Sequence, residues 1–384
     1  MNWEKKRIRE FADVYDGPHA TPKESTTGAV FLGIKNIKPE GGIDLSEIRH
    51  ISDSELEKWT KRVTPTKDDI VLSYEATLHR YAIIPDNFIG CLGRRMALVR
   101  VNKDEVNHKF LYYTFLSDAW RGFIDANKLT GATVDRISIK DFPDYPINLP
   151  PLITQHRIAF ILSAYDDLIE NNLKRIKLLE EKAFLSYKGI VNSEKLERLK
   201  LKEVAGVNES SLKASSNLDK LLYVDISSVS TGSIDNKTEY DLKEAPGRAR
   251  RILKHEDIIW SCVRPNRKSY SFVFLPEDNL IASTGFAVIT AKEIPSSFLY
   301  QLTTSNEFVD YLENHAKGAT YPAVTSKDFE EAYINIPSES TMKEYHQNTY
   351  PLFELKHNLE KQNAKLREAR DILLPRLMSG EIEV

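Results

Sequence analysis

The sequence has 384 residues, of which 41% are hydrophobic and 28% charged, and its formal net charge is −3. This composition predicts a globular chain long enough for two domains, and no apolar run approaches the roughly 18 residues that would cross a bilayer. The balanced charge excludes a uniformly basic nucleic-acid binder but not a local basic surface. Because the start, MNWEKKRIRE, lacks the apolar core of a signal peptide, we expect a cytoplasmic protein with no membrane segment, in which Cys91 and Cys262 are reduced.

The first 148 residues predict a globular α+β domain. Short apolar runs bounded by turn residues are typical of strands, and they are followed by a helical segment over residues 109–127. A loop, Thr130-Gly131-Ala132-Thr133, comes next. The predicted strands cover residues 29–34, 69–73, 81–84, 96–101 and 147–149.

Residues 149–195 predict a long helix that acts as a spacer. Pro150-Pro151 can stand just before a helix, and Thr154 is a plausible N-cap. Apolar residues then follow a heptad, which predicts a coiled-coil seam and therefore a partner helix. One line of the seam holds Ile158, Tyr165 and Leu179, and the other holds Leu162, Ile169, Ile176 and Ala183. Asn172 stands where an apolar seam residue is expected.

A second domain is predicted over residues 196–336, and a second spacer helix with a C-terminal tail over 337–384. Every seventh residue of this helix is leucine, at positions 352, 359, 366 and 373. Leu355 and Ala369 form the second predicted line, which Gln362 interrupts. Aligning the two heptads makes Asn172 and Gln362 equivalent (362 − 172 = 190), so we expect them to form a polar layer that fixes the helix register.

The two halves are related by an internal repeat. Gly131-Ala132-Thr133 matches Gly318-Ala319-Thr320, and Lys140-Asp141-Phe142 matches Lys327-Asp328-Phe329, both at an offset of 187 (318 − 131 = 187). Leu149-Pro150 matches Ile336-Pro337 at the same offset. Weaker matches precede these in the same order, so each half is predicted to be one α+β domain closed by a heptad helix.

The sequence shows no catalytic signature. It contains no Walker A segment, no GxGxxG that opens a helix, and no Asn or Asp followed by Pro-Pro-Tyr or Pro-Pro-Phe. Glu180-Glu181-Lys182 fits part of a nuclease motif, but it lies on a charged helical face. The histidines do not combine with cysteines or carboxylates at metal-ligand spacing. We therefore expect no catalytic residue, metal or cofactor in this chain.

Basic and hydroxyl-bearing loops recur at corresponding places in the two halves. Arginine, asparagine and lysine can read base edges, and small hydroxyl-bearing loops can approach phosphates. Solvated hairpin tips and tight turns are the alternative explanation for these loops. The candidate DNA-binding residues of the first half are His79, Arg80, Arg94, Arg95, Lys128, Thr130 and Thr133. Those of the second half are Arg248, Arg250, Arg251, Arg264, Asn266, Arg267, Lys268, Tyr270, Lys317, Thr320 and Tyr321.

The chain resembles the specificity subunit of a type I restriction-modification system. The resemblance is carried by Leu149–Asn172, by the repeat, by the ending Leu373–Ile382 and by Asp16–Pro22. It implies two target recognition domains, each reading one half of a bipartite site in double-stranded DNA, and two long helices that pair as an antiparallel coiled coil. It also implies two modification (methyltransferase) subunits that use S-adenosylmethionine, and restriction (translocase and nuclease) subunits that use ATP and Mg.

Two other functions remain open from the residues alone. One is a structural coiled-coil adaptor without nucleic acid, and the other is a standalone enzyme that modifies or cleaves DNA. The geometry favours the bipartite reader, because a helix over residues 152–187 would be about 54 Å long at about 1.5 Å per residue. That length exceeds the roughly 34 Å of one DNA turn that separates two half-sites.

Overall fold

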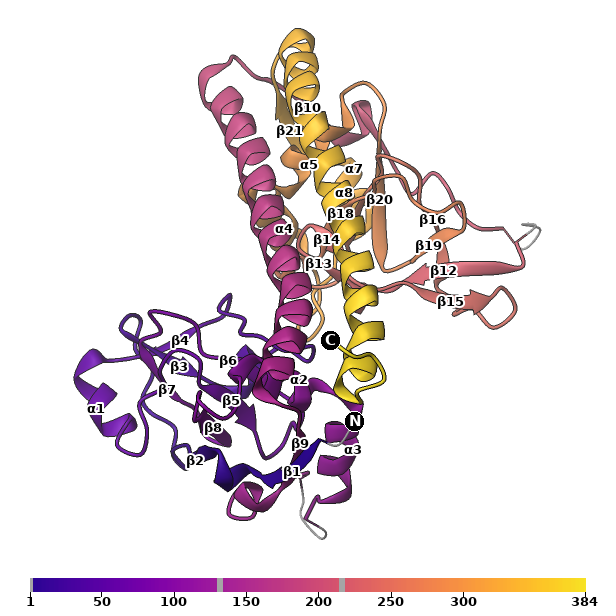
Figure 1. Ribbon diagram of the computed structural model, residues 1–384. Coiled ribbons are helices and arrows are strands. Elements are labelled where there is room, and N and C mark those ends of the chain that lie inside the picture. The colour runs from indigo at the N-terminus through magenta and orange to yellow at the C-terminus, as the bar shows by residue number, and fades with distance from the viewer. Residues whose placement is uncertain (1–2, 130–133, 214–217) are drawn as a thin grey trace. The chain divides into compact units, whose positions relative to one another are not determined.

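The computed structural model describes residues 3–129, 134–213 and 218–384 (Figure 1). Its contacts divide the chain into two compact units, Met1–Glu170 with Asn363–Val384, and Asn171–Gln362. Two long helices, α4 (Leu152–Ser193) and α8 (Glu339–Met378), contribute a part to each unit. Each unit therefore contains one globular domain and one part of both long helices.

The N-terminal domain contains two small sheets. The first is antiparallel, in the order β2-β8-β5-β6, and the second has the order β4-β3-β7 with β3 and β7 parallel. The strands of the first sheet are β2 (Ala12–Asp16), β5 (Ile70–Ser73), β6 (Tyr81–Ile83) and β8 (Met96–Val101). Those of the second are β3 (Ala29–Leu32), β4 (Arg49–Ile51) and β7 (Gly90–Leu92). The sequence predicted β3, β5, β6 and β8 correctly to within about two residues and missed β2, β4 and β7.

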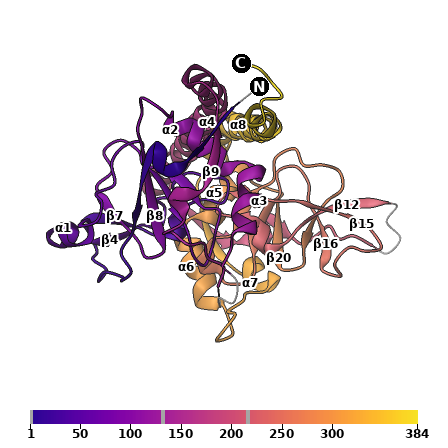
Figure 2. The same cartoon turned by 60° about the horizontal axis from the view of Figure 1, so that its bottom comes forward.

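The alternation of side chains along β8 distributes this strand between two cores. Met96 and Leu98 pack between the two sheets, whereas Ala97 and Val99 point to the opposite face. That face is covered by α2 (His108–Leu116) and α3 (Asp118–Ala126). In Figures 1 and 2 the layers follow one another as α1 (Leu56–Trp59), the sheet with β3, the sheet with β8, and the helices α2 and α3.

The C-terminal domain repeats these layers. Its sheets have the orders β11-β20-β17-β18 and β15-β12-β19-β16, and β12 and β19 are parallel as β3 and β7 are. The first sheet contains β11 (Ala205–Val207), β17 (Ile258–Ser261), β18 (Tyr270–Phe272) and β20 (Phe286–Ala291). The second contains β12 (Lys220–Val224), β15 (Thr238–Asp241), β16 (Ala249–Ile252) and β19 (Leu280–Ser283). The helices are α5 (Ser296–Thr304), α6 (Asn306–His315) and α7 (Ser326–Glu330), and a two-residue hairpin joins β13 (Val229–Ser230) to β14 (Ser233–Ile234).

A short strand pair stands at the base of each domain. β1 (Glu4–Arg7) pairs with β9 (Pro146–Leu149), and β10 (Glu197–Lys200) pairs with β21 (Tyr333–Ile336). In each pair the first strand of a domain is antiparallel to its last strand. The long helix follows the second strand of the pair directly, so each domain is closed at its own base.

Within both units the two long helices run antiparallel. In the first unit Asp166 accepts a hydrogen bond from Arg370 Nη1 at 2.6 Å. In the second unit Asn172 Nδ2 donates to Gln362 Oε1 at 3.0 Å, and Glu180 accepts from Lys356 Nζ at 2.5 Å. As the residue number increases along α4, the number of the contacting residue in α8 decreases, as it does in an antiparallel helix pair.

The heptad of α4 is as predicted, but that of α8 is partly wrong. On α4, Ile158, Leu162, Ile169, Ile176 and Ala183 are buried, and the other two predicted seam residues, Tyr165 and Leu179, are half-buried. On α8, Leu359 is buried, whereas Leu355 is exposed. The second line of that seam instead holds Lys356, Asn363 and Arg370, which are polar. A search for apolar seam residues misses them, because the burial of Lys356 and Arg370 depends on ionic partners in α4.

Two further predictions about the helices are wrong. The offset of 187 that aligns the strands before the helices makes Asn172 equivalent to Leu359 (359 − 172 = 187), and Gln362 is an exposed residue. Asn172 and Gln362 meet because the helices are antiparallel and not because they are equivalent. The helix α4 begins at Leu152, directly after Pro151, so Thr154 lies inside the first turn and is not the N-cap. It also continues beyond residue 187, to Ser193.

No helix in the described part of the chain combines the length and the apolar character needed to cross a lipid bilayer. Among these residues there is also no group of three or more His, Cys, Asp or Glu side chains that could hold a metal ion.

Candidate nucleic-acid interface

In the C-terminal domain, two loops that the sequence singled out separately lie side by side. The loop after β17 begins at Cys262, and the loop between α6 and α7 passes through residues 316–325. Val263 and Ala323 form an antiparallel bridge, and the backbone N–H of Arg264 donates to the carbonyl of Pro322 at 2.7 Å. The two loops therefore form one surface, which we call the paired loops of the C-terminal domain.

Arg264 is held on the exposed ring of Tyr321. Its guanidinium carbon lies 4.5 Å from the ring centroid, and Nη2 donates to the carbonyl of Thr320 at 3.0 Å. The Arg264 backbone is left-handed, with φ 52°, which costs a residue other than glycine about 1–3 kcal/mol. Tyr321 keeps 65% of its surface exposed. A planar cation on an aromatic face is thus presented at the surface of the loops.

The remaining residues of these loops differ in their freedom. Asn266 and Arg267 lie in a 3-10 turn and are exposed. Lys317 and Thr320 of the neighbouring loop are also exposed. Lys268, also left-handed with φ 53°, donates through Nζ to Asn306 Oδ1 at 3.1 Å. These side chains can reach a ligand in solvent.

Tyr270 does not belong to this surface. It is only 8% exposed, and its ring centroid lies 4.7 Å from that of the buried Trp260. Burial also raises the pKa of its hydroxyl to about 12. We therefore exclude Tyr270 from the candidate DNA-binding residues, because β18 directs its side chain into the core.

The N-terminal domain contains the same pair of loops. Glu75 and Arg136 form an antiparallel bridge, and Ala76 N–H donates to the Asp135 carbonyl at 2.8 Å. Ala76 and His79 have φ values of 71° and 62°, so this loop also contains two left-handed residues. The candidates Thr130 and Thr133 lie outside the described residues.

The basic side chains of the N-terminal loops are largely paired with carboxylates. His79 Nε2 lies 3.0 Å from Asp125 Oδ1, and Lys128 Nζ lies 2.8 Å from the same oxygen and 3.1 Å from Asp135 Oδ2. Hydrogen bonds from Lys128 and then from His79 lower the pKa of the Asp125 carboxyl. This network holds His79 and Lys128 in place, whereas Arg267 of the other domain is exposed.

The other basic candidates of this domain have different surroundings. Arg80 Nη1 donates to the Ile37 carbonyl at 3.2 Å, and Arg95 Nε lies 3.1 Å from Glu75 Oε1. Arg94 is exposed in the turn before β8. Arg94 is therefore the candidate of this group that is most open to a ligand.

A second basic segment of the C-terminal domain lies on and before β16. Arg248 and Arg250 are exposed, and Arg250 Nε donates to the Gly247 carbonyl at 3.2 Å. Arg251 Nη1 contacts Ser211 Oγ at 3.4 Å. Burial raises the pKa of Cys262 to about 11, and the charge of Arg251 acts in the opposite direction. Thr284 N–H donates to the Arg248 carbonyl and Cys262 N–H donates to the Gly285 carbonyl, both at 2.8 Å, so the segment is close to the start of the paired loops.

The sequence-based selection missed the counterpart of this segment in the N-terminal domain. Thr66 N–H donates to Asp69 Oδ2, and Lys254 N–H donates to Asp257 Oδ2, both at 2.7 Å, which fixes the local offset at 188 (257 − 69 = 188). At that offset Arg62 corresponds to Arg250. The repeat itself was the signal that would have found Arg62.

Comparison with known proteins decides the family. A family model described as "Type I restriction modification DNA specificity domain" matches residues 1–181 and again residues 193–363. The chain belongs to this family. The two matches divide the chain as its internal repeat does, and each includes the paired loops of one domain.

Relatives and solved structures agree with the assignment. The type I restriction enzyme MjaIX specificity subunit of Methanocaldococcus jannaschii is 25% identical over 100% of this chain and 94% of its own length. The HindI specificity subunit of Haemophilus influenzae is 32% identical over 32% of this chain and 28% of its own length. The fold is similar to the type I restriction-modification S subunit from M. genitalium, with a TM-score of 0.60 and 18% identity over 98% of this chain and 96% of that chain.

Membership of the DNA specificity family gives the chain its general function. It recognises DNA sequence as the specificity subunit of a type I restriction-modification system, and it does so within an assembly of subunits. The α+β domains joined to two antiparallel helices are the fold of that family.

Proposed function

We propose that each domain reads one half of a bipartite DNA target through its paired loops. The observation that supports this most strongly is the recurrence of the loop pair in both domains, with a bridge between the loops and two left-handed residues in each. Left-handed residues other than glycine are costly and concentrate at functional sites. Two solvated hairpin tips would not need the same strained backbone.

The residue types of the C-terminal loops suit base recognition. Arginine can bind guanine O6 and N7 with two parallel hydrogen bonds, and asparagine can bind adenine in the same way. We assign base reading in the C-terminal domain to Arg264, Asn266 and Arg267. Lys317 and the arginines around β16 would bind phosphates, which position the protein without reading sequence. In the N-terminal domain we assign the corresponding contacts with DNA to Arg94 and His79.

The long helices would set the interval between the two half-sites. The helix α4 has 42 residues and is therefore about 63 Å long. We propose that the α4–α8 pair fixes an unread interval and that the Asn172–Gln362 hydrogen bond contributes to its register, as a polar residue in a coiled-coil seam can.

The outer face of α4 supports the binding of partner subunits. Ile153 and Phe160 are 62% and 75% exposed, and Leu178 and Leu185 are 64% and 58% exposed. Each pair is separated by seven residues and so lies on one face of the helix. Exposed apolar residues in such a row mark an interaction surface more often than a solvated one.

We propose that two modification subunits bind to this face and that restriction subunits join the complex through them. Catalysis would then belong entirely to the partners, with S-adenosylmethionine in the modification subunits and ATP and Mg in the restriction subunits. This chain would contribute recognition and assembly, and no catalytic residue.

The proposal is tested by selecting DNA from a randomised duplex library with the chain purified together with its modification subunits. We expect two short sequences separated by a constant, unread interval. A single continuous sequence, or no enrichment by a stable complex, would contradict two-domain reading.

A further inference from the structure

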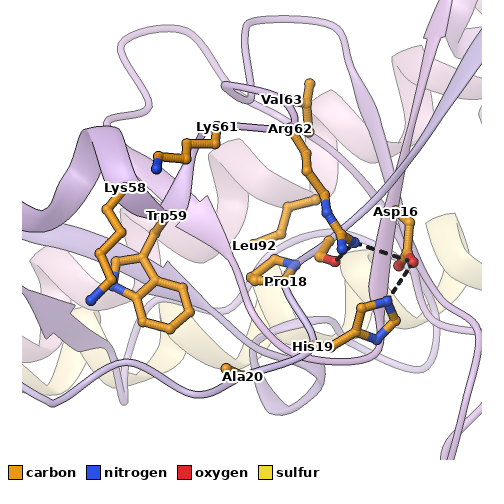
Figure 3. A pocket seen from close by; sticks show the side chains of 11 residues that line it. Asp16, Pro18, His19, Ala20, Lys58, Trp59, Lys61, Arg62, Val63 and Leu92 are labelled. Carbon is orange, nitrogen blue, oxygen red and sulfur yellow. Dashed lines mark hydrogen bonds and ion pairs between the residues drawn. The ribbon is translucent and has the colours of Figure 1, made fainter.

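The N-terminal domain contains a cavity of about 410 Å³ that the paired loops do not include (Figure 3). One side is formed by residues 16–20, at and after the end of β2, and the other by residues 58–59 and 61–63, at and after the end of α1. Its size lies within the roughly 300–1,000 Å³ of pockets that bind small ligands.

The walls of this cavity combine an aromatic ring with charged and polar side chains, and Lys58 and Lys61 lie on the same side as Trp59. Figure 3 shows the Trp59 ring on one side and Asp16, His19 and Arg62 across from it, with Pro18 and Leu92 between them. A flat apolar group can therefore enter beside the indole while polar groups face it from the far side.

The polar side is held together by hydrogen bonds. Asp16 Oδ2 lies 2.9 Å from His19 Nε2 and 3.4 Å from Arg62 Nη1. Arg62 Nη1 also donates to the Gly17 carbonyl at 2.8 Å. The guanidinium is thus anchored at the rim, although 54% of the Arg62 side chain is still exposed.

The charge of the cavity favours an anion. Lys58, Lys61 and Arg62 line it, against the single carboxylate of Asp16. Lys58 Nζ lies 5.3 Å from the centroid of the Trp59 ring and 3.3 Å from Glu55 Oε1, so part of its charge is already compensated. Lys61 is exposed at the rim.

One lining residue of the cavity, Gly17, lies at the end of the sheet where the paired loops begin. Gly17 N–H donates to the Met96 carbonyl at 2.9 Å, and Met96 pairs with Ser73, the last residue of β5. Tyr74 N–H in turn donates to the Arg95 carbonyl at 3.1 Å. DNA that lies on the paired loops would therefore pass close to the Gly17 side of the cavity.

We propose that this cavity binds one DNA nucleotide that has left the base stack, with its base against Trp59 and its phosphate at Arg62. The inference rests on the proposed function of the domain. A phosphate of an intact duplex would need the cations but not the apolar floor of Pro18 and Leu92. A nucleotide uses both, because a base has a π-face for stacking and its phosphate is an anion.

The nucleotide can come from two sources, and the experiment separates them. The probes are a fully paired duplex, the same duplex with one extra unpaired 2-aminopurine, and a single strand containing 2-aminopurine. Binding and 2-aminopurine fluorescence are measured with the full-length chain. If the cavity accepts a base extruded from a duplex, the bulged duplex binds more tightly than the paired one and its fluorescence changes. If it accepts single strands as well, the third probe behaves like the second.

The decisive variants are Trp59→Ala and Trp59→Phe. Loss of base stacking predicts a roughly 5–150-fold weaker binding of the bulged duplex by Trp59→Ala, with little change for the paired duplex. Trp59→Phe retains an aromatic face and should retain most of the preference. Equal binding of both duplexes by the wild-type chain, or an unchanged preference in Trp59→Ala, would overturn the inference.

A second pair of variants does not depend on the fold of Trp59→Ala. Arg62→Gln should reduce the dependence of binding on salt by about one phosphate contact, and Lys343→Gln, an exposed lysine of α8 that pairs with Glu339, is the matched control. An Arg62→Gln salt dependence equal to that of the control would also overturn the inference. If the wild-type chain bound no duplex at all, either alone or together with its modification subunits, the proposed function itself would fail, so the two failures are distinguishable.

Discussion

Asn172→Leu tests whether a polar residue in the helix seam lowers stability and fixes the helix pair. Asn172 is 5% exposed, and its Nδ2 lies 3.0 Å from Gln362 Oε1. Removing one hydrogen bond costs about 0.5–1.5 kcal/mol, whereas burying a leucine side chain contributes about 1.5–3 kcal/mol. The difference predicts a free energy of unfolding that rises by about 1 kcal/mol.

The effect can be measured by calorimetry. Asn172 lies in a unit of 192 residues (362 − 171 + 1 = 192), for which 1 kcal/mol shifts Tm by about 2–4 °C. Gln362→Leu is the comparison, because residue 362 is exposed and a leucine there recovers little apolar surface. Both variants should also broaden the interval between modified half-sites, since slipped helix pairs become accessible.

A lower Tm for Asn172→Leu would refute this reasoning, because it would show that the polar contacts of Asn172 stabilise the pair by more than a leucine can replace. A higher Tm with an unchanged interval would retain the energetic argument and reject the role in register.

Three other predictions concern the loops and the first unit. Arg267→Ala should weaken discrimination at one base pair of one half-site by about 1–3 kcal/mol, measured by competition between target variants, and an equal loss at both half-sites would contradict the assignment. Tyr321→Ala should weaken DNA binding in part as Arg264→Ala does. Tyr321→Phe retains the aromatic face that Arg264 contacts at 4.5 Å, so it should bind DNA as the wild type does. A Phe variant that binds as weakly as the Ala variant would argue against stacking. Asp166→Asn removes a charged partner from Arg370, whose side chain is 14% exposed. The free energy of unfolding should fall by about 1.5–3 kcal/mol, measured by denaturation. An unchanged denaturation midpoint would show that the ion pair contributes nothing to stability.

Periodic and repeated features of the sequence predicted much of the fold. The strands over 70–73 and 96–101 follow from short apolar runs bounded by turn residues, and the helix α4 follows from an apolar pattern of period seven, because a buried seam requires apolar residues at regular intervals. The pairing of β1 with β9 had no such signal, since strand partners distant in sequence leave no local pattern. The line of Lys356 and Arg370 in α8 was missed for a related reason, because its burial depends on carboxylates in another helix.

The residue types of the candidate site could be predicted from the sequence, but the contacts and burial of each residue could not. The sequence selected Arg264 and Tyr321 from separate stretches, and only the structure shows that they stack. It also selected Tyr270, which has the right chemistry for DNA but is buried in the core. Arg62 was overlooked because its segment was not aligned with that of Arg250, although the repeat contains the alignment.

The most direct measurement of the central claim is a map of modified adenines in cells that express this chain with its modification subunits. The account predicts one bipartite motif with a constant interval, and it predicts that Arg264→Ala together with Arg267→Ala changes one half of the motif and leaves the other half and the interval unchanged. A motif that is continuous, or one whose two halves both change in that variant, would contradict the reading of one half-site by each domain.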